Sequence, residues 1–214
     1  MKNLKLTSEA TFNGKPILNG DGEFRCYATL LQRIDDLMGY MTANHSRVTA
    51  VRFDLRYPPI NTQTSNNDVS NLCKRLKENA KNQGIKLLLF WVREQSRAKH
   101  QHYHCIALLD GSKVRSEFNF MQVVDEMWQK VIKVQQPGLV HYCNFNETNR
   151  YEVMIQRPTA TATGNKLEAQ QRAFTNNYNT FFKRASYLAK EGQKGYAPRR
   201  RRNFGGSQMS RKKS

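Results

Sequence analysis

The sequence predicts an α+β fold in which helices flank a central, mostly antiparallel β-sheet. Stretches with apolar residues at helical spacing alternate along the chain with short runs that are typical of strands. Two of these runs, residues 85–94 and 101–109, are separated only by a short polar loop, as in an antiparallel hairpin. The order helix, strand, helix, strand, strand, helix, strand, strand, helix indicates an α+β chain, and one domain is the simplest count.

The predicted helices each carry an apolar stripe. The first spans residues 23–43, with apolar side chains every three or four positions. Asn67 or Asp68 is suited to begin the second, and Gly84 to end it. A third helix is expected at 120–134. The last, at 167–190, has a stripe made of Phe174, Tyr178, Phe181, Ala185 and Leu188.

The predicted strands differ in pattern. Residues 48–57 alternate between apolar side chains and the charged residues Arg52, Asp54 and Arg56, until Pro58 ends the strand. Residues 85–94 form a continuous apolar run, which predicts a central strand. Further strands are expected at 101–109, 139–145 and 150–156, and a loop at 158–165.

Charge divides the chain unevenly. The 214 residues carry a net charge of +18, which favours an anionic partner such as nucleic acid or an acidic membrane surface. Residues 192–214 contain eight Lys and Arg and no acid, so +10 remains on residues 1–191. The sequence therefore predicts an irregular N-terminal arm at 1–22, a folded domain at 23–191 and a flexible basic tail at 192–214 that forms no part of the core.

Several classes of protein are excluded by the sequence. No stretch approaches the ~20 consecutive apolar residues of a membrane span, and the polar N-terminus resembles no secretory signal, so we expect a cytoplasmic protein. Cys26, Cys73, Cys105 and Cys143 form no CxxC pair, which argues against a zinc ribbon and favours buried thiols.

A pair of histidines on a predicted strand is a candidate metal site. His102 and His104 are two residues apart, so both project from the same face of the strand. If the hairpin loop is centred near residue 98, Glu94 lies opposite His102 and completes a site of two imidazoles and one carboxylate. Such mixed ligands suit Mg²⁺ or Mn²⁺. The alternative is that both histidines are merely polar residues near the start of a strand.

Tyr187 is a candidate nucleophile on the last predicted helix. A helical wheel places it opposite the apolar stripe and next to Lys183 and Lys190. Flanking ammonium groups are expected to lower its pKa and to attract a phosphate, and a phenolate can attack phosphorus. The alternative is an ordinary surface or interface tyrosine. We expect DNA phosphates to contact six basic residues: Lys183, Lys194, Arg199, Arg200, Arg201 and Arg202. Tyr196 and Phe204 are candidates for stacking on unpaired bases.

Four motifs in this order resemble the HUH endonuclease superfamily. They are VRFDLRY at 51–57, HYHCIALL at 102–109, YLAK at 187–190 and RNFGGS at 202–207. The closer resemblance is to rolling-circle replication initiators of the filamentous-phage (inovirus) type and to the YagK/YfjJ C-terminal-domain family. It implies an antiparallel sheet related to the RNA-recognition-motif topology, His102 and His104 as metal ligands, Tyr187 as nucleophile and Lys190 as an assisting cation. The single tyrosine of YLAK departs from initiators that use two.

The resemblance also implies an activity. It is metal-dependent, sequence-specific nicking and joining of single-stranded or supercoiled DNA through a 5′-phosphotyrosine, which starts rolling-circle replication of a phage, satellite or other mobile element in a bacterial cell. The chain has no P-loop, so unwinding and synthesis would need a host helicase and polymerase. The alternative is a protein with the same fold that binds an origin or operator without cutting it. A ribosome-associated RNA-binding protein is a third alternative; it ranks last, because only the charge suggests it and charge explains neither the histidine pair nor YLAK.

Overall fold

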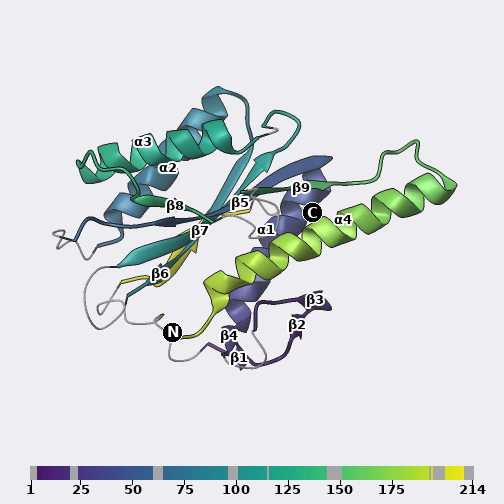
Figure 1. Cartoon of the computed structure of the whole chain (residues 1–214), viewed down its shortest axis with the longest axis horizontal. Helices are drawn as coiled ribbons and strands as arrows, with labels where there is room; N and C mark the ends of the chain where they lie inside the picture. The colour runs from purple at the N-terminus through teal and green to yellow at the C-terminus, as the bar shows by residue number, and fades with distance from the viewer. Residues whose placement is uncertain are drawn as a thin grey trace.

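The fold has three layers, with one sheet between two pairs of helices (Figure 1). The computed structural model describes residues 4–19, 24–59, 65–95, 101–114, 116–143, 151–192, 194 and 201–209. Helices α1 (Ala28–Asn44) and α4 (Gly164–Ala185) cover one face of the sheet. Helices α2 (Asn67–Asn82) and α3 (Phe118–Ile132) cover the other. The expected α+β class, with a central antiparallel sheet flanked by helices, is confirmed.

The sheet is antiparallel throughout its described pairs. Its strands are β5 (Arg47–Leu55), β6 (Leu87–Glu94), β7 (His102–Asp110), β8 (Val140–Tyr142), β9 (Glu152–Gln156) and β10 (Phe204–Gly206). They lie in the order β10-β6-β7-β5, and the outer edge of β5 pairs with β8 and with β9. The central strands β5, β6 and β7 therefore have hydrogen-bonded neighbours on both sides.

Two apolar cores hold the layers together. Val51, Phe53 and Leu55 of β5 pack into the core beneath α2 and α3. Val48 and Ala50 of the same strand pack beneath α1 and α4. Arg52 and Asp54 continue this second face, because alternate residues of a strand point the same way. The charged face of β5 is thus turned toward α1 and α4 rather than toward α2 and α3.

The N-terminal segment contains more regular structure than an irregular arm. β1 (Leu6–Thr7) pairs with β4 (Cys26–Tyr27), and β2 (Thr11–Phe12) pairs with β3 (Lys15–Pro16). Ile17 is buried in the core beneath α1 and α4. The predicted helix at 23–43 begins only at Ala28, because β4 occupies the residues just before it.

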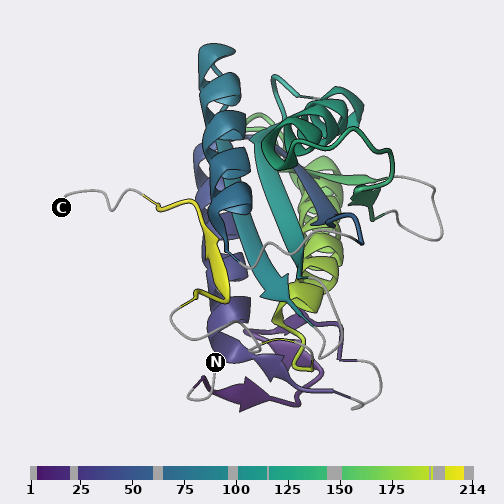
Figure 2. The same cartoon turned by 90° about the vertical axis from the view of Figure 1, so that its left-hand side faces the viewer.

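The prediction that residues 192–214 form no part of the core is wrong for the described stretch 201–209. Figure 2 shows β10 in yellow at the edge of the sheet, where Phe204 lies opposite Val92 of β6. Ser207 is 2% exposed, its N–H donates to the carbonyl of Leu89, and its Oγ accepts from the Leu89 N–H. The basic segment therefore supplies an edge strand.

None of the helices in the described part of the chain combines the length and the apolar composition that a membrane span requires.

Candidate functional site

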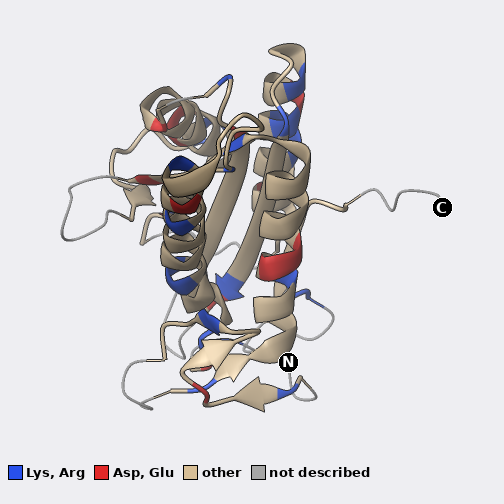
Figure 3. Ribbon diagram, turned by 90° about the vertical axis from the view of Figure 1, so that its right-hand side faces the viewer, with Lys and Arg blue, Asp and Glu red and all other residues tan. Residues whose placement is uncertain are grey.

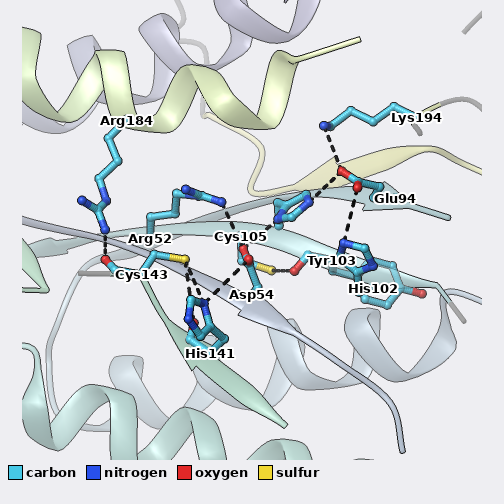
Figure 4. A network of polar contacts seen from close by, with 11 residues as sticks. Arg52, Asp54, Glu94, His102, Tyr103, Cys105, His141, Cys143, Arg184 and Lys194 are labelled. Atoms are coloured by element: carbon cyan, nitrogen blue, oxygen red, sulfur yellow. Dashed lines mark hydrogen bonds and ion pairs between the residues drawn. The ribbon is translucent and has the colours of Figure 1, made fainter. Parts of the chain in front are cut away.

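Glu94, His102 and His104 meet at the end of the β6–β7 hairpin, on the face covered by α1 and α4. The strand register pairs Glu94 with His102, as the sequence predicts, and Val92 with His104. Glu94 Oε2 lies 2.8 Å from His104 Nε2, and Glu94 Oε1 lies 3.6 Å from His102 Nε2 (Figure 4). One ligand atom from each of the three side chains falls within 4.8 Å of the others, so the group could hold a metal ion.

The histidines differ in their surroundings. The His104 side chain is 4% exposed, whereas that of His102 is 30% exposed. Burial, together with the nearby His104, lowers the pKa of His102. A lowered pKa favours the neutral imidazole, which is the form that binds metals. One candidate ligand is thus buried and the other is partly open to solvent.

Asp54 adds a second carboxylate, whose role the motifs alone do not reveal. It lies opposite His104 in the β5–β7 pair, and its Oδ1 is 2.7 Å from His104 Nδ1. Burial by itself would raise the pKa of Asp54, but the hydrogen bond and charge of His104 outweigh burial and lower it. A carboxylate on one ring nitrogen fixes the ring and leaves the other nitrogen to a metal. Asp54 is therefore placed to orient His104.

Lys194 forms an ion pair inside the site. Its Nζ lies 3.2 Å from Glu94 Oε2, and its side chain is only 1% exposed (Figure 4). Burial lowers the pKa of Lys194, although the charge of Glu94 opposes that effect. Burial alone would raise the pKa of Glu94, but the hydrogen bond with His104 and the charge of Lys194 lower this pKa to about 2. Glu94 is thus ionised and already paired with a cation.

Tyr187 lies against this group because the last helix ends early. The sequence predicts one helix to residue 190, whereas α4 ends at Ala185 and the 3-10 helix η2 (Ser186–Ala189) follows. Leu188 of η2 is fully buried in the core. The ring of Tyr187 meets the ring of His104 edge-on, with centroids 4.9 Å apart and planes at 81°. The helical wheel was right that Tyr187 avoids the apolar core but wrong about the element that carries it.

The cations around Tyr187 are only partly the expected ones: Lys190 is among them and Lys183 is not. Arg52 Cζ lies 4.2 Å from the centroid of the Tyr187 ring, Lys194 Nζ 5.2 Å and Lys190 Nζ 5.9 Å. Lys190 lies closer to Phe24, at 4.1 Å from that ring. Lys183 is exposed on the last turn of α4.

The expected lowering of the Tyr187 pKa is wrong. Burial, and then the negative charge of Glu94, raise the pKa of Tyr187, and the charge of Arg52 offsets only part of this. The prediction failed because it counted only the nearby cations, and neither the burial of the tyrosine nor the carboxylates on the same face of the sheet. Tyr187 is thus a neutral phenol in this structure.

A second group of possible metal ligands adjoins the first. His141 Nδ1 lies 3.6 Å from Cys143 Sγ and 4.0 Å from Asp54 Oδ2. Arg52 contacts Asp54 at 3.5 Å, and Arg184 donates a hydrogen bond to the carbonyl of Cys143 (Figure 4). The positive charges of these two arginines oppose the binding of a metal cation to Asp54, His141 and Cys143. The group formed by Glu94, His102 and His104 is therefore the better metal candidate.

The expected DNA-binding residues are distributed differently from the prediction. Arg201 and Arg202 are exposed just before β10, while Arg199 and Arg200 lie outside the described residues. Lys194 is buried rather than on the surface. Of the two expected stacking residues, Tyr196 is also outside the described part. Phe204 instead packs on Phe90, with ring centroids 6.2 Å apart.

Sequence reasoning missed the parts of the site that come from distant segments. Arg52 and Asp54 stand on β5, and their alternation with apolar residues gave the only signal that they share one face. His141 and Cys143 reach the site from β8 and the residue after it. No spacing rule links these residues to the histidines, because strand pairing alone brings them together.

Comparison with known proteins assigns a family to the chain. Residues 7–207 match the model of the YagK/YfjJ C-terminal domain. The chain is also similar to the uncharacterized protein YagK of Escherichia coli (strain K12), with 24% identity over 212 residues that cover 83% of this chain and 91% of that protein. No solved structure is significantly similar. Because the matched range includes β5, the histidine strand, η2 and β10, the chain belongs to the YagK/YfjJ C-terminal domain family.

Proposed function

We propose that this protein is a metal-dependent enzyme that nicks and rejoins DNA through a covalent phosphotyrosine. The observation that carries the proposal is the contact between Tyr187 and His104, whose ring centroids are 4.9 Å apart. These residues come from η2 and β7, so a potential nucleophile and a potential metal ligand converge from distant parts of the chain. The position of this tyrosine beside a histidine–carboxylate group supports a catalytic role.

The residues present fit a divalent metal ion. Glu94, His102 and His104 offer a carboxylate and two imidazoles, and the lowered pKa values of Glu94 and His102 keep both in the unprotonated form that binds metal. Imidazole and carboxylate ligands suit Mn²⁺, and Mg²⁺ prefers the oxygen ligands among them. When bound, such an ion would polarise a phosphate oxygen.

The chemistry of the chain's own residues follows from their positions. The Tyr187 oxygen would form a bond to phosphorus while the bond from phosphorus to the 3′ oxygen of the strand breaks. The phenol loses its proton and the departing 3′ oxygen gains one, which leaves a 5′-phosphotyrosine and a free 3′-hydroxyl. Lys190, whose Nζ is 5.9 Å from the Tyr187 ring centroid, would offset negative charge near the phosphate. The reverse reaction would rejoin a strand.

The proposed biological role is the start of rolling-circle-type replication of a phage, satellite or other mobile element. A free 3′-hydroxyl is the end that a polymerase extends, and the covalent link preserves the phosphodiester for later closure. The net charge of +18 supports a nucleic-acid substrate. Figure 3 shows that Lys and Arg occur on several helices, so the basic character is not restricted to the end of the chain.

The test is the covalent adduct. The protein is incubated with Mn²⁺ and single-stranded or supercoiled DNA from its own genetic neighbourhood, and products are separated under denaturing conditions. Tyr187→Phe is expected to abolish the adduct and leave DNA binding nearly unchanged, since only the hydroxyl is removed. Tyr178→Phe is the matched control. The Tyr178 hydroxyl donates to Asp35 Oδ1 at 2.8 Å, so this variant should still form the adduct.

Two outcomes would contradict the proposal. An adduct that persists in Tyr187→Phe would exclude Tyr187 as the nucleophile. Wild-type protein that binds its DNA tightly yet forms no adduct with Mn²⁺ or Mg²⁺ would instead favour the non-cleaving origin- or operator-binding protein. EDTA and His104→Ala should each suppress the adduct if the histidine group holds the metal.

A further inference from the structure

Arg52 is a partly buried cation of the site, and one of its donors, Nε, is buried without a partner in the described part of the chain. It stands on β5, and its side chain is 13% exposed. Its described ion pair is long, at 3.5 Å from Nη2 to Asp54 Oδ1, and that same oxygen lies 2.7 Å from His104 Nδ1. The Nε of Arg52 has no hydrogen-bond partner in the described part of the chain. A buried donor without a partner is costly, and such a group commonly awaits a ligand.

The neighbours of Arg52 point to an anion as that ligand. Arg184, on the last turn of α4, bonds to the carbonyl of Cys143, and its pKa is lowered by burial and next by the positive charge of Arg52. Lys190 and Lys194 add two more cations around the same tyrosine. Four cations thus stand against the two carboxylates Glu94 and Asp54. A phosphate would offset the excess positive charge around Tyr187.

We propose that Arg52 binds the DNA phosphate at which Tyr187 reacts, and so positions that phosphate beside the tyrosine hydroxyl. This proposal rests on the proposed function and names the residue that recognises the reacting phosphate. The guanidinium lies 4.2 Å from the Tyr187 ring centroid, so both side chains can contact one phosphate. The planar fork of an arginine can donate two parallel hydrogen bonds to one phosphate, a fixed bidentate geometry that the ammonium group of a lysine does not offer.

If Arg52 had only a structural role, its replacement would have a different effect. In that case Arg52 would tie β5 to η2 by stacking on Tyr187, and its replacement would lower stability without regard to any single phosphate. The two roles can be distinguished by combining the Arg52 substitution with the removal of a single charge from the DNA and measuring whether the two effects are additive. Removal of one charge from the DNA backbone should cancel the effect of the Arg52 variant only if Arg52 contacts that phosphate.

The experiment uses the full chain and an oligonucleotide whose nick position has been mapped with the wild-type protein. Single phosphates around the nick are replaced, one at a time, by uncharged methylphosphonates. Binding is measured with Tyr187→Phe as the parent, so that cleavage does not interfere. Arg52→Gln is expected to weaken binding of the unmodified strand by about tenfold or more, the usual effect of removing a hydrogen bond to a charged group. It should cause no further weakening when the reacting phosphate is neutral.

Three comparisons complete the test. Arg52→Lys keeps the charge and should fall between the parent and Arg52→Gln, which protects the test if the glutamine variant folds poorly. Arg75→Gln, at an exposed position of α2, should show no coupling to any phosphate. Adduct formation by the wild-type protein is checked first. If it forms none, the proposed function fails and this inference falls with it. If it forms the adduct but Arg52→Gln and Arg52→Lys show equal effects at every linkage, or none, the inference alone is overturned.

Discussion

His104 connects the two carboxylates of the site, one at each ring nitrogen. Asp54 lies 2.7 Å from Nδ1 and Glu94 lies 2.8 Å from Nε2. For a metal ion to bind His104 through Nε2, it must take the place of the hydrogen bond to Glu94, while Asp54 can stay where it is. Asp54 thus has an orienting role, and Glu94 is the carboxylate that must change partner.

Lys194 should compete with a metal ion for Glu94. Its ammonium group lies 3.2 Å from Glu94 Oε2, where it repels a second cation. Lys194→Met should therefore tighten the binding of Mn²⁺, by about tenfold on a Coulomb estimate for a partly buried charge. Lys190→Met is the matched control, because the Lys190 Nζ lies against Phe24 instead. Calorimetric titration with Mn²⁺ measures both. Weaker binding in Lys194→Met would show that the ammonium supports the metal site.

Glu94 should also make the metal-free protein sensitive to acid. Its pKa is about 2 in the folded chain against an ordinary value of 4.5. A carboxylate whose pKa falls on folding stabilises the native state above the unfolded pKa, and this contribution disappears as the pH falls through the folded pKa. In EDTA, the free energy of unfolding should therefore drop between about pH 4.5 and about pH 2, by up to about 3 kcal/mol from Glu94.

Urea unfolding followed by tryptophan fluorescence at several pH values measures this decrease. Glu94→Gln should flatten the curve over that interval, because the amide does not titrate there. Glu78→Gln, at an exposed position whose side chain is 60% accessible, should leave it unchanged. Parallel curves for Glu94→Gln and the wild-type protein would show that Glu94 gains no special stabilisation of its charged form on folding.

Local residues of the site were predictable, and distant ones were not. Glu94 and His102 belong to one hairpin, so counting residues on either side of its loop gave the register that the structure confirms. Asp54 is 50 residues from His104, and Lys194 is 100 residues from Glu94. No local pattern encodes such contacts, because they depend on which strands become neighbours and on where the chain returns after η2.

At the scale of elements, β10 is the strand that could not be predicted from the sequence. A strand of three residues is too short to show any alternation, and its two glycines suggest a flexible loop. In the structure those glycines allow β10 to lie close to β6. A Cβ on Gly205 would lie 2.6 Å from Cζ2 of Trp91, and one on Gly206 would meet the carbonyl of Leu89. Small residues are needed here for packing rather than for backbone freedom.

Gly205→Ala should therefore weaken the docking of β10. The added methyl group collides with the Trp91 ring, and overpacking of this kind typically costs about 1–3 kcal/mol. Gly39→Ala is the control, and it should change stability in the opposite direction. Gly39 lies inside α1, where a Cβ would meet only the Tyr178 hydroxyl at 4.0 Å, so alanine should stabilise the helix by roughly 0.5–1 kcal/mol. Thermal unfolding measures the stability of both variants. Unchanged stability of Gly205→Ala would show that the Trp91 ring can move aside without a loss of stability.

At the scale of the whole molecule, the sheet is buried on both faces, and this explains where the site can form. Helices α1 and α4 cover the face that carries the histidines, but α4 ends at Ala185. Beyond that point, Tyr187 of η2 lies against His104, and Lys194 lies against Glu94. The sequence showed that the chain has alternating and continuous apolar strands, but the position at which a covering helix stops is a property of tertiary packing.

The basic end of the chain contributes both a strand and charge, so deleting it would not test DNA binding cleanly. Substitution is cleaner: Arg201 and Arg202 are exposed, and the Arg202 contact with Asn66 uses its backbone carbonyl. The double variant Arg201→Gln, Arg202→Gln should keep β10 and weaken DNA binding at low salt. Each phosphate that a protein no longer neutralises lowers the slope of log K against log salt by about 0.7–0.9, so two such phosphates should lower it by roughly 1.4–1.8.

The matched control is Lys74→Gln with Arg75→Gln, which removes the same charge from exposed positions of α2, on the face of the sheet opposite the histidine group. Fluorescence anisotropy with a labelled single strand, at several salt concentrations, gives the slopes. Only the pair next to β10 should change the slope, because a direct phosphate contact releases counterions whereas a distant charge alters only the overall field. Equal slopes for both variants and the wild-type protein would mean that Arg201 and Arg202 do not contact DNA. The affinity would then have to come from the cations that surround Tyr187.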